Sequence, residues 1–266
     1  MAKTPEKAFY AVNPASVRKL EGGGYSRVYF GAEFCQWRLP SPSVMLKVLR
    51  AAHEQGMGFT LLTPWATDSG IARINLLLES LSGEAVKGIE VVVNDFGVLE
   101  ALRKHRALTP VLGRLLVKQK RCPRIPGIVK GLPDAGRESY LKPGVEDPET
   151  AGFLKKYRIK RIELDSPLQG VDADLKLVGL KGSIYTTFAF VTTTRHCPAS
   201  FDGETWQAFT GCRIKGCTGN IIELSNPEHK EPLLMRGNTQ FTRAGEIPAN
   251  ISAMGIDRIV VMEETP

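Results

Sequence analysis

Short runs of β-branched and aromatic residues alternate with amphipathic stretches along the first half of the chain. The runs YSRVYFG (25–31), GFTLLTP (58–64) and GIEVVVND (88–95) are typical of strands, and the last is apolar on both faces, as buried parallel strands are. Between them, apolar residues recur at helical spacing, which predicts amphipathic helices. The predicted helices cover residues 40–56, 67–83 and 96–108.

The boundaries of these helices are marked by capping residues. A serine precedes the first helix and Gly56 follows it, and Asp68 is expected to be the N-cap of the second. Asp95, just ahead of FGVLEAL, is expected to cap the third. The apolar stripe of the first helix predicts that its buried residues are Met45, Val48, Leu49 and Ala52.

The alternation continues through the middle of the chain and weakens in its last third. The run GRLLVKQ (113–119) predicts a strand, and a Pro/Gly-rich insertion at 120–147 follows it. Later segments predict a helix at 148–157, a strand at 158–167, a helix at 173–180 and a strand at 182–191. Near the end, NIIELSN, PLLMRGNTQFTR and IDRIVVME indicate strands with little helix between them.

Strands separated by helices at this spacing indicate parallel βαβ units. At least six such strands, with no nucleotide-binding fingerprint after the first, predict an α/β fold of the (β/α)8, TIM-like barrel type. Its C-terminal end is expected to be incomplete or distorted. We expect one domain over residues 1–266, with 1–24 as an N-terminal extension and 195–220 as a cysteine-rich loop.

The composition permits a packed core and narrows the choice of partners. Of the 266 residues, 42% are hydrophobic and 24% charged, and the net charge of +7 favours anionic partners. Because this charge is scattered, with its densest runs at 117–124 and 155–161, RNA is the less favoured partner. Neither an N-terminal apolar segment nor a membrane-spanning run is found, so we expect a cytoplasmic protein.

Three of the five cysteines lie within RHCPASFDGETWQAFTGCRIKGC (195–217), among small and polar residues. Five is an odd number for a disulfide framework, and clustered cytosolic cysteines are more often metal ligands or catalytic thiols. Cys35 follows the first predicted strand and Cys197 follows the sixth. Because the carboxyl ends of parallel barrel strands meet on one face, these two and the late pair Cys212 and Cys217 are expected to share one rim.

Four thiolates could hold a zinc ion or a [4Fe–4S] cluster. Zinc sites usually pair their ligands in C-x₂-C knuckles, whereas the spacing here is C-x₁₄-C-x₄-C plus one remote cysteine. A cluster accepts ligands from separate loops, so we favour [4Fe–4S] and keep zinc as the alternative. Cys122 is interpreted as a small buried apolar residue.

Polar residues follow several predicted strand ends, where barrel enzymes carry catalytic and binding groups. The candidates for catalysis are Glu33, Asp165 and His196. The candidates for substrate binding are Asn94, Lys118, Gln119 and Arg121. The alternatives are a turn start for Asp165, a packing role for His196 and a solvated basic patch around Arg121.

The order of GAEFC, VVVNDFGVLE, GRLLVKQKRCPR, RIELDSP, the late cysteine-rich loop and RGNTQF resembles the collagenase-like peptidase U-thirty-two family. The similarity is greatest to its short UbiV-like and UbiU-like members and spans roughly residues 25–262. It implies a barrel that holds a [4Fe–4S] cluster on Cys35, Cys197, Cys212 and Cys217. It also implies oxygen-independent hydroxylation, either of ubiquinone precursors or of tRNA and rRNA bases with prephenate as donor, and pairing with a paralogue.

The leading hypothesis is therefore an iron–sulfur protein that takes part in oxygen-independent hydroxylation, or a related redox modification, of a small organic substrate in anaerobic metabolism. The alternatives are a non-catalytic iron–sulfur partner subunit of a larger enzyme and an RNA-base hydroxylation factor. A paralogous heterodimer partner or a homodimer is expected. Peptidase activity is not expected, because the chain has neither an HExxH helix nor a GxSxG elbow.

Overall fold

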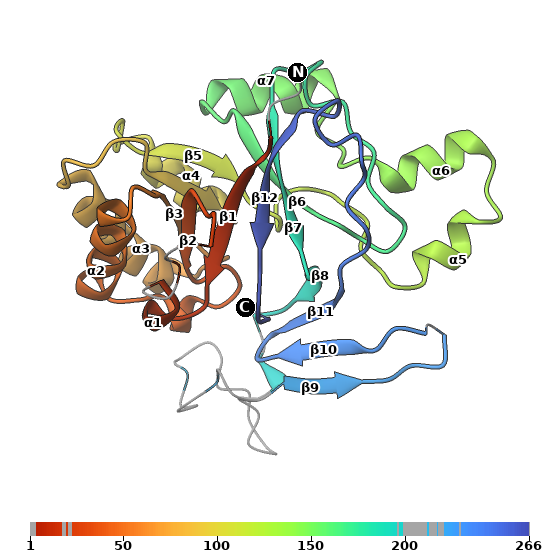
Figure 1. Ribbon diagram of the computed structural model, residues 1–266, viewed down its shortest axis with the longest axis horizontal. Helices are drawn as coiled ribbons and strands as arrows, with labels where there is room; N and C mark the ends of the chain where they lie inside the picture. The colour runs from red at the N-terminus through yellow and green to blue at the C-terminus, as the bar shows by residue number, and fades with distance from the viewer. Residues whose placement is uncertain are drawn as a thin grey trace.

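Eight parallel strands form a closed barrel in the computed structural model (Figure 1). The structure describes residues 4–17, 20, 23–195, 197–198, 212, 217, 221–228 and 230–265. The barrel strands are β1 (Glu6–Ala11), β2 (Arg27–Gly31), β3 (Gly58–Leu62), β4 (Glu90–Val93), β5 (Thr109–Leu112), β6 (Arg161–Asp165), β7 (Lys181–Thr186) and β12 (Ile256–Val261). They follow one another in chain order around the barrel, and β12 closes it between β7 and β1. The predicted TIM-like α/β fold is confirmed.

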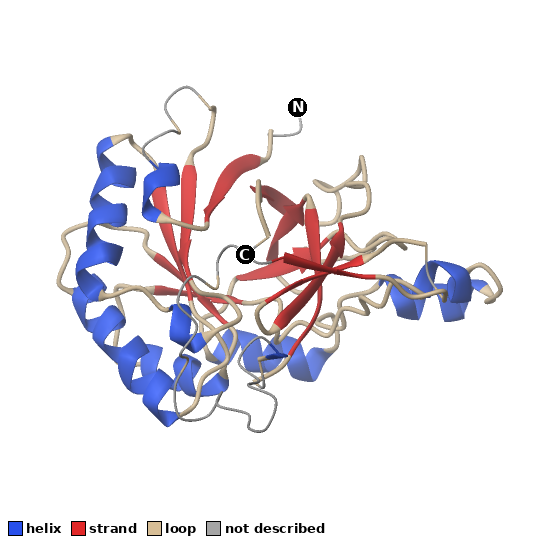
Figure 2. Ribbon diagram, turned by 90° about the horizontal axis from the view of Figure 1, so that it is seen from below, coloured by secondary structure: helices blue, strands red, loops and turns tan. Residues whose placement is uncertain are grey.

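Helices cover part of the outside of the barrel, and others project from it (Figure 2). They are α1 (Pro14–Val17), α2 (Pro42–Glu54), α3 (Asp68–Ser82), α4 (Phe96–Leu102), α5 (Ile125–Val129), α6 (Asp134–Leu141) and α7 (Pro148–Lys156), with a short 3-10 turn, η1 (Gln36–Arg38). Helix α2 begins as predicted, because the Ser41 hydroxyl accepts a hydrogen bond from the Val44 N–H. Its buried residues are the four that the apolar stripe predicts.

The Pro/Gly-rich insertion contains α5 and α6, which project away from the barrel (Figures 1 and 2). Elsewhere, Thr67 rather than Asp68 occupies the N-cap position of α3, whereas Asp95 caps α4 as predicted by accepting a bond from the Gly97 N–H. No helix in the described part of the chain combines the length and apolar character that crossing a membrane requires.

A four-stranded antiparallel sheet replaces a helical connection between β7 and β12. Its strands, in the order β8–β11–β10–β9, are β8 (Phe188–Thr193), β9 (Ile221–Leu224), β10 (Leu233–Arg236) and β11 (Thr239–Arg243). The chain passes from the barrel into this sheet at Thr187, whose φ of 74° bends the backbone between β7 and β8. The single strand predicted at 182–191 is therefore two strands. The distortion expected at the C-terminal end of the barrel is this inserted sheet.

Three further segments differ from the sequence prediction. The first barrel strand, β1, lies inside residues 1–24, which were expected to be an extension. The fifth strand is Thr109–Leu112, and the predicted strand 113–119 is a turn. Pro110 argues against a strand when the sequence is read alone. The structure tolerates this proline because β5 registers with β6 at only one position, Leu112 with Ile162.

The segment predicted as a helix at 173–180 forms turns instead. Gly170, before this segment, and Gly179, near its end, have positive φ angles of 89° and 69°. Between them, the N–H of Leu175 donates to the carbonyl of Met254, so part of this backbone is satisfied by a tertiary contact.

The core has three parts. The largest lies between the barrel and its helices, and a second fills the barrel interior with residues such as Tyr29, Tyr185 and Met262. A third, formed by Phe34, Phe190 and Phe241, lies where the inserted sheet meets the barrel. The inserted sheet is therefore anchored by its own aromatic cluster.

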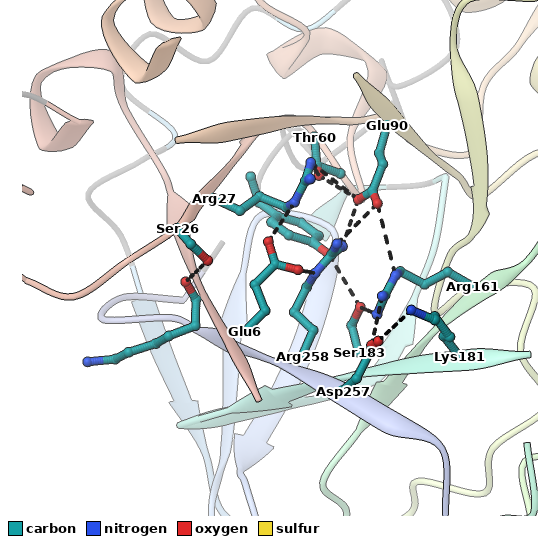
Figure 3. A network of polar contacts seen from close by, with 12 residues as sticks. Glu6, Ser26, Arg27, Thr60, Glu90, Arg161, Lys181, Ser183, Asp257 and Arg258 are labelled. Carbon is teal, nitrogen blue, oxygen red and sulfur yellow. Dashed lines mark hydrogen bonds and ion pairs between the residues drawn. The ribbon is translucent and has the colours of Figure 1, made fainter. Parts of the chain in front are cut away.

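An ionic network closes the N-terminal end of the barrel, where the strands begin (Figure 3). Arg258 binds Glu6 and Glu90 at 2.6 Å each, and Arg27 binds Glu6 at 3.0 Å. Arg161 binds Asp257 at 2.7 Å. Burial alone would raise the pKa of Glu90, but the surrounding arginines, led by Arg258, lower it overall.

Glu163, on β6, is fully buried in the barrel interior beside this network. Its Oε1 accepts a hydrogen bond of 3.1 Å from the Tyr29 hydroxyl, whereas its Oε2 has no partner among the described residues. Burial raises the pKa of Glu163 to about 7, although Arg258 and Arg161 act against this shift. This carboxyl group is therefore neutral at low pH and only partly ionised at neutral pH.

Candidate functional site

All four predicted ligand cysteines line one cavity of about 180 Å³ at the C-terminal end of the barrel. Cys35 follows β2 and precedes η1, Cys197 follows β8, and Cys212 and Cys217 lie between β8 and β9. Cys197 is buried, Cys35 and Cys217 are half-buried, and Cys212 is exposed. The cavity thus brings together thiols from distant parts of the chain. The expected reason was wrong for three of them, because only Cys35 follows a barrel strand and the other three belong to the inserted sheet and its loop.

The turn between β10 and β11 links the segments that carry these cysteines. The side-chain amide of Asn238 donates one hydrogen bond to the Phe34 carbonyl at 2.9 Å and another to the Thr194 carbonyl at 2.8 Å. In return, the Asn238 carbonyl accepts a bond of 3.0 Å from the Thr194 N–H. Phe34 directly precedes Cys35, so this asparagine holds the β2 loop beside the end of β8.

The neighbouring residue in this turn, Gly237, lies against two of the thiols. It has a φ of 59°, and a Cβ at this position would lie 3.2 Å from Sγ of Cys217 and 4.0 Å from Sγ of Cys197. Both sulfurs are therefore close to one point of the turn. Glycine is required here by the backbone conformation and by the approach of the Cys217 thiol.

The electrostatic surroundings of Cys35 show that it interacts with other thiols of the cavity. Burial raises the pKa of the Cys35 thiol, and the nearby Cys197 and Cys212 raise it further. The backbone N–H groups of Trp37 and Arg38 oppose this shift, because they favour the thiolate. A cation bound among these thiols would therefore favour their ionised form.

Three arginines and a tyrosine line the same cavity: Arg38, Arg195, Arg236 and Tyr10. Arg236 is buried, and burial together with the charge of Arg38 lowers its pKa. Burial and the Glu33 carboxylate raise the pKa of Tyr10, so this phenol stays protonated. Arg195 lies over the ring of Trp65 at 4.2 Å. The cavity therefore combines thiols with positive charge, which suits an anionic group.

Below the cavity lies a buried ion cluster around Arg114. Its Nε and Nη2 bind the two carboxylate oxygens of Glu33 at 2.9 and 2.6 Å, and its Nη1 binds Asp165 at 2.7 Å. Its guanidinium also lies 3.8 Å from the ring centre of Tyr185. Arg114, Glu33 and Asp165 have completely buried side chains. Glu33 reaches the cavity wall, so this cluster forms part of its floor.

Asp165 is held by a second arginine as well. Nε of Arg121 binds it at 2.6 Å, and the Phe190 N–H donates to its Oδ1 at 3.0 Å. Burial alone would raise the pKa of Asp165, but Arg114 and Arg121 lower it overall. The carboxylate is therefore ionised and fixed in place, which suits a positioning role better than proton transfer.

The predicted substrate-binding residues lie outside the cysteine cavity. Asn94 bonds the Thr63 carbonyl and the Leu115 N–H, and Gln119 bonds the backbone of Asp165 on both its amide atoms. Arg121 binds Asp165 as described, and Lys118 is exposed. Three of these four residues thus connect loops at the barrel rim.

The remaining candidates are placed as follows. Cys122 is half-buried and accepts a hydrogen bond of 3.3 Å from Nε of Arg124, so the prediction of a buried apolar residue is wrong; it does not line the cavity. Trp37 lines the cavity beside Cys35. His196 lies outside the described residues.

Sequence reasoning missed Arg114, Tyr10, Arg236 and the Gly237–Asn238 turn. Arg114 was assigned to a strand, and Tyr10 to an extension. The signal for the turn was present in RGNTQF, because glycine and asparagine between two strand-like runs are typical of a tight hairpin. Nothing in the local sequence shows that this hairpin faces the cysteines.

The donor set of the cavity was compared with the needs of a metal centre. Four thiols are suitable ligands for iron–sulfur clusters and for zinc. Within the described part of the chain, no three His, Cys, Asp or Glu side chains are grouped closely enough to hold one metal ion. The residue types therefore fit such a centre, whereas the described side chains line one cavity without being grouped as a metal site.

Comparisons with models of known protein families, with curated proteins and with solved structures find no match to this chain. The class that the structure defines is a TIM-like α/β barrel with an inserted antiparallel sheet. The resemblance to the peptidase U-thirty-two family stays a prediction that rests on the order of motifs in the sequence.

Proposed function

We propose that this chain is an iron–sulfur protein in which Cys35, Cys197, Cys212 and Cys217 hold a [4Fe–4S] cluster. The observation that carries the proposal is the single cavity that all four thiols line. The chemistry of two further groups supports the proposal. Backbone N–H groups favour the Cys35 thiolate, and Gly237, which has no side chain, lets the sulfurs of Cys217 and Cys197 lie close to the β10–β11 turn. When bound, such a cluster supplies one-electron chemistry.

The proposed reaction is an oxygen-independent hydroxylation, or a related redox modification, of an organic substrate, as in the family that the motifs resemble. The described residues would supply its binding and orientation. Arg38 and Arg236 would attract an anionic group, and Tyr10 would present a protonated phenol to the cavity. Arg114 would hold the Glu33 carboxylate in a fixed orientation.

A second candidate is a non-catalytic iron–sulfur subunit that docks on a larger enzyme. One observation favours it: the two described candidates for catalysis, Glu33 and Asp165, are both committed to buried ion pairs. An assay of hydroxylation or a related redox reaction distinguishes the two candidate functions. The anaerobically purified, reconstituted chain is tested alone and with co-purifying partners. Turnover by the chain alone supports the first, and turnover only with a partner supports the second.

Metal analysis tests the cluster itself. Purification without oxygen, or reconstitution with ferrous iron and sulfide, should give about four iron and four sulfide ions per chain. The reduced protein should give the EPR signal of a [4Fe–4S] centre. A zinc-only protein, or one that holds neither metal, would contradict the proposal.

Cysteine variants make this test specific. Cys35→Ser and Cys197→Ser should lose most of the bound iron, because each removes a ligand. Cys122→Ser is the matched control, since Cys122 lies outside the cavity, and it should retain the iron of the wild type. Equal loss in all three variants would show that the iron is bound nonspecifically.

A further inference from the structure

A second concave site lies on the opposite, N-terminal side of the barrel. It is a surface cavity of about 480 Å³ between the segment that enters β5 and the segment that enters β6. Its floor is apolar and includes Leu99, Leu102, Pro110 and Tyr157. Its cationic lining residues are Arg103, Lys104, Arg106, Lys156 and Arg158. This site is called the basic pocket below.

Positive charge in the basic pocket is almost unopposed. The only carboxylate among its lining residues is Glu100, which Arg103 binds at 2.7 Å. The dense basic run at 155–161 supplies two of the five cations here, Lys156 and Arg158. Such a concentration of like charge raises the local concentration of anions.

Arg158 occupies a backbone conformation that disfavours arginine. Helix α7 ends in a Schellman motif, in which the Arg158 N–H bonds the Lys155 carbonyl at 3.0 Å and the Ile159 N–H bonds the Leu154 carbonyl at 2.9 Å. Arg158 is the left-handed residue of this motif, with a φ of 61°. Glycine is usual at this position, because an L side chain is strained there.

Stability alone does not account for this arginine. The C-terminal charge of α7 is already balanced by Lys155 and Lys156 in its last turn. The hydrogen bond from Arg158 to the Arg106 carbonyl is long, at 3.4 Å. Strained residues that persist in a concave site are often kept for binding.

We propose that the basic pocket binds a phosphate-bearing ligand and that Arg158 is one of its contacts. Guanidinium groups match phosphate oxygens in pairs, and three of the five cations are arginines. The phosphate belongs either to a small phosphorylated molecule or to a nucleic-acid backbone. Because the pocket lies opposite the cysteine cavity, it anchors or senses this ligand and takes no part in chemistry at the cavity.

Binding and stability measured on the same variant test the proposal. The probes are inorganic pyrophosphate, followed by calorimetry and thermal unfolding, and a labelled single-stranded RNA oligonucleotide, followed by fluorescence anisotropy at several salt concentrations. Arg158→Gly should weaken binding of the recognised probe about tenfold, because one charged contact is lost. The same variant should raise the midpoint of thermal unfolding by about 2 °C, because the strain is relieved.

Two matched variants serve as controls. Thr187→Gly relieves the other described non-glycine positive φ without changing the pocket, and Arg137→Gln removes an exposed cation from the projecting helix α6. Both should bind the probe like the wild type. Binding of pyrophosphate identifies a small-molecule site, and binding of RNA alone, weakening steeply with salt, identifies a nucleic-acid site.

Three results would overturn the proposal. The first is that wild-type protein binds neither probe. The second is that Arg158→Gly binds as tightly as the wild type. The third is an equal loss of binding in Arg137→Gln, which would show that net charge alone attracts the probe. A lower unfolding temperature for Arg158→Gly would show that the arginine stabilises the fold and would remove the argument from strain.

Discussion

The two ends of the barrel both carry arginine–carboxylate networks, but these networks have different surroundings. At the N-terminal end, Glu6 and Glu90 are each shared by more than one arginine, and all of these residues lie on the strands themselves (Figure 3). At the C-terminal end, Arg114 alone binds Glu33, and the cluster meets an open cavity lined by thiols. Carboxylates that each have several arginine partners suit structural closure, whereas Glu33, with one arginine partner and a place in the cavity wall, suits a site.

The largest expected effect comes from removing Arg114, the central arginine of the C-terminal cluster. Arg114→Met leaves Glu33 without its arginine partner and Asp165 with Arg121 alone. We expect a loss of about 3–5 kcal/mol in the free energy of unfolding, because a buried charge becomes uncompensated. Urea denaturation measures it. A loss below about 1 kcal/mol would mean that water reaches Glu33 freely.

Glu163 should give the largest dependence on pH. Its folded pKa of about 7 lies above the unfolded value of 4.5, so it is neutral in both states at low pH and carries no penalty there. As pH rises from 4.5 to 7, Glu163 ionises in the unfolded chain but stays largely protonated in the folded protein. The free energy of unfolding therefore falls by up to about 3 kcal/mol over this range. Glu163→Gln should therefore be more stable than wild type at pH 8 and similar at pH 4.

Denaturation curves of both proteins between pH 4 and pH 8 check this prediction. The difference between them isolates Glu163 from groups with lowered pKa values, such as Glu90 and Asp165, whose stabilising contribution is lost on acidification. A difference that does not change with pH would show that Glu163 is already ionised throughout this range.

Removing an arginine from the N-terminal network should have a smaller effect than removing Arg114. In Arg258→Met, Glu6 keeps Arg27 at 3.0 Å and Glu90 keeps Arg27 at 3.5 Å. We expect a loss of about 2 kcal/mol, because the carboxylates retain partners. The exposed pair of Arg50 and Glu84 provides the control, and Arg50→Ala should change stability by about 0.5 kcal/mol or less. Equal losses for Arg258 and Arg114 would remove the distinction between the two ends.

The smallest expected change in stability lies in the turn beside the cysteines. Gly237→Ala introduces a methyl group 3.2 Å from the Cys217 sulfur at a positive φ, so we expect a loss of about 1 kcal/mol. The iron content after reconstitution should also fall clearly, because the altered turn would displace the Cys217 thiol. Gly152→Ala, in α7 with open space around it, should leave the iron content unchanged.

The position of the cysteine site could be predicted from the sequence in outline. Cys35 follows barrel strand β2, so its place on the rim follows from the parallel topology. Cys197 follows β8 of the inserted sheet, so its approach to Cys35 depends on how that sheet packs on the barrel. The charged residues that define the floor could not be predicted. The contact between Arg114 and Glu33 joins residues 81 positions apart, and that between Asn238 and Phe34 joins residues 204 positions apart.

Local periodicity was enough to predict most helices, most barrel strands and the caps of α2 and α4. The remaining features depend on tertiary contacts. Strand β5 forms despite Pro110 because it pairs with β4 along its whole length and with β6 only at Leu112, and the chain at 173–180 forms turns because Met254 satisfies part of its backbone. Local preferences act between residues a few positions apart, whereas the identity of each buried ion pair depends on where the closed barrel brings distant strands together.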